Sequence, residues 1–260
     1  MISVSNISLG QNDSGETKGL SLEFISEVTS ITPDKPFYVG LKIKHAPGFH
    51  TYWKNPGVVG IPTKMRWSLP TGFKASEIQW PYPQTSKMAH YPCFGYKRDV
   101  LLIVKITPPS ELSVNQVTLT TDTNWMCCSS TCYPGFKKLS LTLPINQKDK
   151  KQHLDPHLTK AFQEAKASVP AQTNKIQAKL LSPNNSPDIE VQITTLGDVI
   201  PLYVFNSDGQ TTPDLPFSLN KKDNHTWTFR AKRSEFSSKT ATTFPFILKT
   251  STGHYEIIAQ

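Results

Sequence analysis

This chain has only four cysteines, and it lacks long apolar runs, dense charge clusters and long helical patterns. No segment approaches the roughly 18 apolar residues that a membrane-spanning helix requires. The N-terminus lacks the basic, apolar and small-residue sections of a secretory signal. We therefore expect either a cytosolic protein or one whose leader has been removed.

Charge is also not concentrated in any one segment. Lys and Arg number 28 against 20 Asp and Glu, which gives a net charge of +8. The basic residues are scattered, and the densest group, "KDKKQH" at 148–153, is typical of a solvated linker. No segment interleaves basic residues with stacking aromatics, as binders of single-stranded nucleic acid do. We expect no nucleic-acid partner, and the charge is assigned to solubility.

The composition favours strands over helices. The 21 prolines and 13 glycines favour short strands joined by turns, so the predicted class is mostly β. In residues 37–44 apolar and polar side chains alternate, which is the pattern of a half-buried strand. Further strands are predicted at 20–28, 63–69, 99–107, 116–127 and 136–143.

This alternation stops between residues 146 and 172. Asp155 and Pro156 favour a helix start, and Leu158, Phe162 and Ala165 fall on one helix face, so a short helix is predicted within 155–167. Alternation resumes in six segments from about residue 173, enough for a small sandwich. The predicted organisation is a β domain at 1–147, a charged linker with a short helix at 148–172, and a second β-sandwich domain at 173–260.

Three of the four cysteines lie within "NWMCCSSTCYPG", residues 124–135. Side chains alternate between the two faces of a strand, so Cys127 shares the inward face with Leu119 and Trp125. Cys128 is predicted to point outward, and on the following strand Cys132 falls on that same outward face. A hairpin with the loop Ser129, Ser130 and Thr131 would pair them.

The same hairpin gives sensible partners along its whole length. It places Asp122 opposite Lys138 and Leu119 opposite Leu141. Directly opposed residues of antiparallel strands have Cα atoms roughly 4.5 to 5.5 Å apart, within reach of a disulfide. The pattern therefore predicts that Cys128 and Cys132 can bond.

Three interpretations of these cysteines remain open at this point. A disulfide that closes so short a loop stabilises a fold little, and cross-strand bonds beside a tight turn are often strained, so redox exchange is favoured over a structural bond. The chain has no Cys-x-x-Cys motif of the thioredoxin type. A site for copper(I) or zinc would draw its soft ligands from a set that comprises Cys127, Cys128, Cys132, Cys93, His90 and Met126.

Four motifs carry a family resemblance, and they occur in this order: "GFHTYWKNPG" at 48–57, "LPTGFKASEIQWPYP" at 69–83, "GYKRDVLLIVKITPP" at 95–109 and "WMCCSSTCYPG" at 125–135. Together they resemble the periplasmic N-terminal region of the DsbD and ScsB family of transmembrane disulfide reductases. The resemblance implies an immunoglobulin-like sandwich, followed in the ScsB branch by a second β domain. We therefore expect two immunoglobulin-like β-sandwich domains joined by a short helical linker.

The same resemblance implies a function. It assigns Cys128 and Cys132 as the catalytic pair of a thiol:disulfide interchange protein that uses no cofactor. Such a module would receive electrons from its own C-terminal thioredoxin-like domain and reduce periplasmic disulfide proteins. The chain would be the soluble periplasmic part of an inner-membrane protein, attached to a transmembrane domain of the same polypeptide, with its leader removed. The alternative is a non-catalytic copper-binding or scaffold domain with a structural disulfide.

Other residues have expected roles around this pair. His90, Tyr91 and Phe94 are expected to form a loop that shields the disulfide. Cys93 and Cys127 are expected to be auxiliary buried thiols, with a second disulfide between them as the alternative. For residues 50–57, which include Tyr52 and Trp53, a packed turn is favoured over a binding surface.

Overall fold

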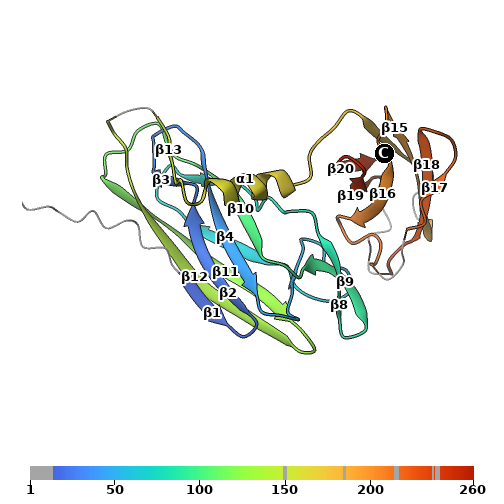
Figure 1. Ribbon diagram of the computed structural model, residues 1–260, viewed down its shortest axis with the longest axis horizontal. Coiled ribbons are helices and arrows are strands. Elements are labelled where there is room, and N and C mark those ends of the chain that lie inside the picture. The colour runs from blue at the N-terminus through green and yellow to red at the C-terminus, as the bar shows by residue number, and fades with distance from the viewer. Residues whose placement is uncertain (1–13, 149–150, 184–185, 214–216, 236, 238–240) are drawn as a thin grey trace, which may run out of the picture.

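The protein is mostly β, as predicted, and its described part contains one helix, α1 (Thr159–Ser168) (Figure 1). The structure is a computed structural model that describes residues 14–148, 151–183, 186–213, 217–235, 237 and 241–260. Across these ranges, no helix is long and apolar enough to cross a membrane.

Two sheets face each other in the N-terminal part of the chain. The first has five strands in the order β1 (Ser14–Thr17), β2 (Leu20–Ser26), β4 (Phe37–His45), β10 (Val100–Thr107) and β7 (Lys74–Ala75). The second has three, in the order β12 (Cys132–Pro144), β11 (Gln116–Cys128) and β6 (Lys64–Ser68).

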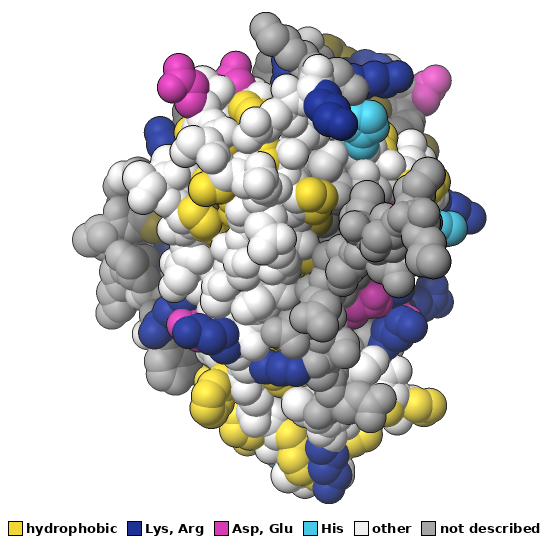
Figure 2. Space-filling model, turned by 90° about the vertical axis from the view of Figure 1, so that its left-hand side faces the viewer, with side chains coloured by type: hydrophobic (Ala, Val, Ile, Leu, Met, Phe, Trp, Pro, Cys, Tyr) yellow, Lys and Arg dark blue, Asp and Glu magenta, His cyan; other side chains and the backbone are white. Residues whose placement is uncertain are grey.

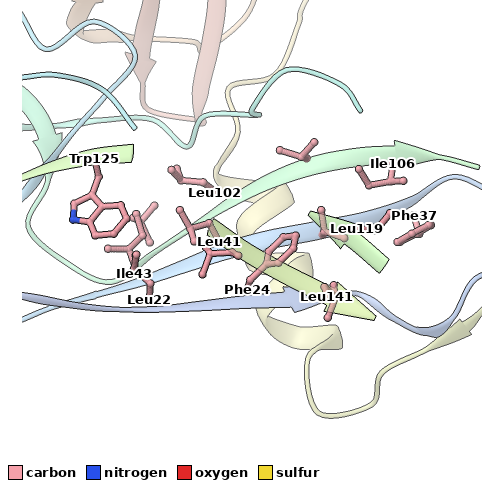
Figure 3. Packing of buried hydrophobic residues seen from close by; sticks show 14 of the residues in the cluster. Leu22, Phe24, Phe37, Leu41, Ile43, Leu102, Ile106, Leu119, Trp125 and Leu141 are labelled. Atoms are coloured by element: carbon pink, nitrogen blue, oxygen red, sulfur yellow. The ribbon is translucent and has the colours of Figure 1, made fainter. Parts of the chain in front are cut away.

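The main hydrophobic core fills the space between these sheets. Leu41 and Ile43 of β4 and Leu102 of β10 point toward Leu119 and Trp125 of β11 (Figure 3). Each is almost fully buried, because alternate side chains of both sheets face inward. The alternation in residues 37–44 therefore identified a true core strand.

The predicted hairpin register is confirmed. Strands β11 and β12 pair with Asp122 opposite Lys138, Leu119 opposite Leu141 and Cys128 opposite Cys132. The apolar side chains of both strands of the hairpin point into the same core. A slip of one residue in the pairing would turn all of these apolar side chains to the opposite face.

A small sheet crosses the end of this hairpin. It has the order β5 (Thr51–Tyr52), β9 (Tyr91–Tyr96) and β8 (Gln84–Met88). His50, just before β5, forms an antiparallel bridge with Cys128. The small sheet is therefore joined directly to the cysteine-bearing end of β11.

The helix begins later than predicted but buries the predicted face. It starts at Thr159, whose backbone N–H and hydroxyl both donate to the carbonyl of Asp155. Phe162 and Ala165 pack on Ile25 and Ile103, on the outer side of the five-stranded sheet. Just before the helix, strand β13 (His153–Leu154) pairs with β3 (Val28–Ser30), so the predicted linker is partly tied to the first sandwich.

Residues 173–260, which we call the C-terminal lobe, form two further sheets. One has the order β14 (Ile176–Leu180), β15 (Asp188–Thr195), β18 (Thr226–Lys232) and β17 (Asn220–Lys221). The other has the order β16 (Pro201–Asn206), β19 (Phe244–Thr250) and β20 (His254–Ala259). All six predicted segments contain strands, and their apolar faces form a second core. Phe205 and Ile247 belong instead to the first core. The domain boundaries remain a prediction.

Figure 2 shows the left-hand face of the view in Figure 1. Lys and Arg side chains are scattered over this face, and they do not gather into one continuous patch. This distribution fits the scattered basic residues of the sequence.

Candidate functional site

A disulfide joins Cys128 and Cys132 at the end of the β11–β12 hairpin, and their Cα atoms are 4.1 Å apart. The predicted pairing is therefore present in the structure. The two cysteines differ in exposure, because Cys128 is fully buried at 0% exposure and Cys132 is half-buried. Solvent reaches the bond mainly from the side of Cys132.

The burial of Cys128 corrects one expectation. Cys127 points into the main core, as predicted, and Cys128 points to the opposite face. That face was expected to be outward, but the small sheet covers it. The cluster around the disulfide contains Tyr52, Cys93, Val59, Met88 and Met126.

Residues 50–52 attach the small sheet to the end of β11 that carries the disulfide. The backbone N–H of His50 donates to the carbonyl of Cys128 over 2.9 Å, and the N–H of Cys128 donates back over 3.0 Å. Two residues later the Tyr52 side chain reaches the disulfide, and its hydroxyl lies 3.8 Å from Sγ of Cys132. Tyr52 and Trp53 are 1% and 0% exposed, which confirms the packed turn expected for this segment.

Cys93 is a third cysteine in the disulfide cluster. Its Sγ lies 3.9 Å from Nε2 of His50. Burial raises the pKa of the Cys93 thiol to about 11. Burial also lowers the pKa of His50 to about 4, with smaller contributions from the positive charges of His45 and Lys97. Near neutral pH both side chains are therefore uncharged, and Cys93 is a poor nucleophile toward the adjacent disulfide.

Cys127 is likewise a buried free thiol, with a pKa raised by burial to about 11. It lies in the main core, whereas Cys93 lies in the disulfide cluster, and no disulfide joins the two. The expectation of two auxiliary buried thiols therefore agrees with the structure. The alternative of a second disulfide does not.

The three residues expected to shield the disulfide lie elsewhere. Phe94 is buried in the main core, where it packs against Trp53. His90 and Tyr91 are exposed at the turn between β8 and β9. Adjacent residues of β9 point to opposite faces, so Cys93 faces the disulfide and Phe94 faces away. Tyr52 and Met88 pack against the disulfide in place of the three expected residues.

The geometry does not favour the metal interpretation. Cys127 and Cys128 point to opposite faces of β11, so they cannot bind one ion together. Over the part of the chain that the structure describes, no group of three or more His, Cys, Asp and Glu side chains is arranged to hold a metal ion.

Residues 23–144 match the family model described as "Thiol:disulfide interchange protein DsbD, N-terminal". No curated protein matches the chain. The fold is similar to that of the N-terminal periplasmic domain of ScsB from Proteus mirabilis, with a TM-score of 0.65, 16% identity and 93% of each chain covered.

A conserved domain protein from Bacillus anthracis is less similar, with a TM-score of 0.29 and 9% identity over 94% of this chain and 79% of that one. The family match contains the strands of the two facing sheets except β1 and the first three residues of β2, and it includes both cysteines of the disulfide. Residues 23–144 therefore match the DsbD N-terminal family of thiol:disulfide interchange proteins, and the likeness to ScsB is one of fold.

Proposed function

We propose that this protein is a periplasmic module that relays electrons by thiol:disulfide exchange through Cys128 and Cys132. One observation carries the proposal: the disulfide lies at the end of a hairpin, with Cys132 half-buried and Cys128 fully buried. A purely structural disulfide would add little stability here, because it closes so short a loop. A bond that opens needs one sulfur that a partner can reach, and Cys132 provides it.

The difference in exposure supports one order of reaction, which we include in the proposal. A thiolate of a thioredoxin-like donor attacks Sγ of Cys132, and a bond forms between the donor sulfur and Cys132. The bond from Cys132 to Cys128 breaks, and Cys128 leaves as a thiolate that takes up a proton. The second thiol of the donor then attacks the donor sulfur of the mixed disulfide. The products are an oxidised donor and two reduced cysteines, so two electrons have moved.

Delivery to a substrate follows the same path in reverse. Cys132 attacks the disulfide of a periplasmic partner, and the thiol of Cys128 resolves the resulting mixed disulfide. The Tyr52 hydroxyl is placed to donate a hydrogen bond to the Cys132 thiolate, which favours the reactive form. Cys93 and Cys127 have no part in this cycle, because both are buried and uncharged near neutral pH.

The likeness to DsbD and ScsB supports the choice of partners. The proposed donor is a thioredoxin-like domain of the same polypeptide, linked to this module through a transmembrane domain. The proposed acceptors are periplasmic proteins with disulfides. The module is then one part of a larger protein-disulfide reductase.

Single cysteine variants test the proposal. The protein is incubated with an excess of a reduced thioredoxin-like donor, and loss of the disulfide is followed by alkylation and mass spectrometry. The wild type, Cys93→Ser and Cys127→Ser should all be reduced. Reduced Cys128→Ser, which keeps only the accessible thiol of the pair, should then trap a mixed disulfide with an oxidised partner. Cys132→Ser should trap none. Equal trapping by both variants, or a wild type that the donor does not reduce, would refute the proposal.

A further inference from the structure

The cover of the disulfide continues into the C-terminal lobe. Residues 50–60, which we call the cover segment, begin at the His50 bridge to Cys128 and carry Tyr52 onto the disulfide. The segment then turns back, so that Gly60 lies flat against the Tyr52 ring, where a Cβ atom would overlap it. Val59 belongs to the same cluster as the disulfide. Both ends of the segment therefore contact the redox site.

The middle of the cover segment is held by the C-terminal lobe. The Asn55 side chain is 8% exposed, and its Nδ2 donates to the backbone carbonyl of Asn206 over 2.9 Å. Asn206 is itself fully buried at 0% exposure, and its side chain donates to Asp208 and to the carbonyl of Pro245. This hydrogen bond therefore joins the segment to a fixed point of the lobe.

Close packing reinforces that bond. A Cβ atom at Gly57 would lie 2.5 Å from the Pro213 ring, so the backbone of the segment touches the lobe directly. One strand away, Phe94 packs edge-to-face on Phe205 of the lobe at 5.3 Å between ring centroids. The N–H of Phe94 donates to the carbonyl of Pro56, which links this contact back to the segment. Figure 1 shows the lobe beside the β8–β9 hairpin, in agreement with these contacts.

We propose that the C-terminal lobe positions the cover segment over the disulfide through Asn55, Asn206 and Phe205. Held in this way, Tyr52 and Val59 close off Cys128 and leave Cys132 as the sulfur that can be reached. The lobe then makes the exchange selective, because a small thiol gains access to the buried side only when the segment moves away. Asn55 is a positioning residue and takes no part in the chemistry. This inference rests on the proposed exchange at Cys128 and Cys132.

Asn55→Asp tests the inference with almost no change in side-chain shape. The remaining Oδ1 still accepts from the N–H of Gly57, a contact of 3.3 Å, so the turn itself is kept. The donor to Asn206 is lost, and a carboxylate oxygen faces its carbonyl instead. The readout is the second-order rate constant for reduction of the disulfide by dithiothreitol. We expect an increase of about tenfold, the scale that follows when a buried group loses its hydrogen-bond partner.

Two control variants separate positioning from general weakening. Asn220→Asp makes the same change at an exposed amide of the lobe that donates to the carbonyl of Ser218, and it should react like the wild type. Ile193→Val trims the core of the lobe and should lower the melting temperature without speeding reduction. Phe205→Leu alters the contact from the lobe side and should speed reduction as Asn55→Asp does, which also serves if Asn55→Asp does not fold.

An unchanged rate in both Asn55→Asp and Phe205→Leu would overturn the inference. So would an equal acceleration in Ile193→Val, because the effect would then come from lower stability alone. Reduction by dithiothreitol needs no protein partner. A wild type that fails to exchange with a thioredoxin-like donor would therefore refute the proposed function, and this measurement would still decide the positioning role.

Discussion

The hydroxyl of Tyr52 lies 3.8 Å from Sγ of Cys132, the less buried cysteine of the disulfide. In the reduced protein, a hydrogen bond from this hydroxyl would stabilise the thiolate of Cys132 more than its thiol. Tyr52→Phe should therefore slow the reaction of Cys132 with an alkylating reagent. The Phe ring fills the same buried space, so the melting temperature should change little.

The measurement is the rate of alkylation of reduced Cys128→Ser against pH, with and without Tyr52→Phe. Near pH 7 the loss of one hydrogen bond should slow alkylation by about fivefold. Tyr91→Phe, at an exposed position on the β8–β9 turn, is the matched control and should have no effect. A profile that does not move in Tyr52→Phe would show that the hydroxyl does not act on Cys132.

Cys93 and Cys127 should resist alkylation in the folded protein. Burial raises the pKa of each thiol to about 11, so about one molecule in a thousand carries the thiolate at pH 8. Iodoacetamide at pH 8 should leave both unmodified in the native oxidised protein and modify both in denaturant. Mass spectrometry counts the labels. Rapid labelling of Cys93 before unfolding would mean that the cover segment opens readily.

Cys127 contributes to stability and not to exchange. Its side chain is fully buried in the main core, so Cys127→Ser places a hydroxyl among apolar groups. The loss in the free energy of unfolding should be about 1 to 3 kcal/mol. Cys127→Ala, which adds no polar group, should lose less. Urea unfolding measures both, and exchange with a thioredoxin-like donor should persist in each variant. Loss of exchange in Cys127→Ser alone would contradict this assignment.

His50 should make the protein less stable in mild acid. Burial lowers its pKa from 6.5 to about 4, so between these pH values the unfolded chain binds a proton that the folded protein does not. The free energy of unfolding should be unaffected by His50 above pH 6.5. It should fall as the pH drops toward 4, by about 3 kcal/mol in total, because each pKa unit corresponds to about 1.4 kcal/mol.

His50→Gln removes the side chain that takes up this proton. The free energy of unfolding should therefore fall less steeply as the pH drops. The comparison is the change in the free energy of unfolding between pH 7 and pH 4.5 for each protein, from urea titrations. Other titrating groups, including His45, contribute to both proteins and cancel in the difference. An equally steep fall in His50→Gln would assign the acid sensitivity to those groups instead.

Much of the fold follows from local patterns. The hairpin register was predictable because Leu119, Trp125 and Leu141 share one parity and the turn between the strands is short. The same counting placed Cys127 in the core and Cys128 opposite Cys132. The segment of the helix was also predictable, from the spacing of Phe162 and Ala165.

What covers Cys128 was not predictable in the same way. Parity gives the face of a strand but not what packs on that face, and the cover comes from Tyr52, Val59 and Met88, distant in sequence. Phe94 was misassigned for a related reason. Its strand is buried on both faces, so an aromatic side chain there can belong to either the core or the disulfide cluster. Side chains alternate between the two faces of β9, so Cys93 and Phe94 point in opposite directions. This alternation could have shown that only one of them contacts the disulfide.

The contacts of the C-terminal lobe were the least predictable part. Asn55 and Asn206 are separated by 151 residues, and neither lies in a sequence pattern that predicts their contact. From the sequence alone, the Asn side chain of "KNPG" is expected only to stabilise a turn. Its hydrogen bond to Asn206 of the lobe becomes evident only in the structure.

In the proposed relay, a partner attacks Cys132 first. The most direct measurement maps the mixed disulfide that forms when the oxidised wild-type protein meets a reduced thioredoxin-like donor that keeps only its attacking cysteine. The complex is quenched in acid and digested, and the cross-linked peptides are identified by mass spectrometry. We expect to find the donor on Cys132, with Cys128 recovered as a free thiol. A donor found predominantly on Cys128 would contradict it.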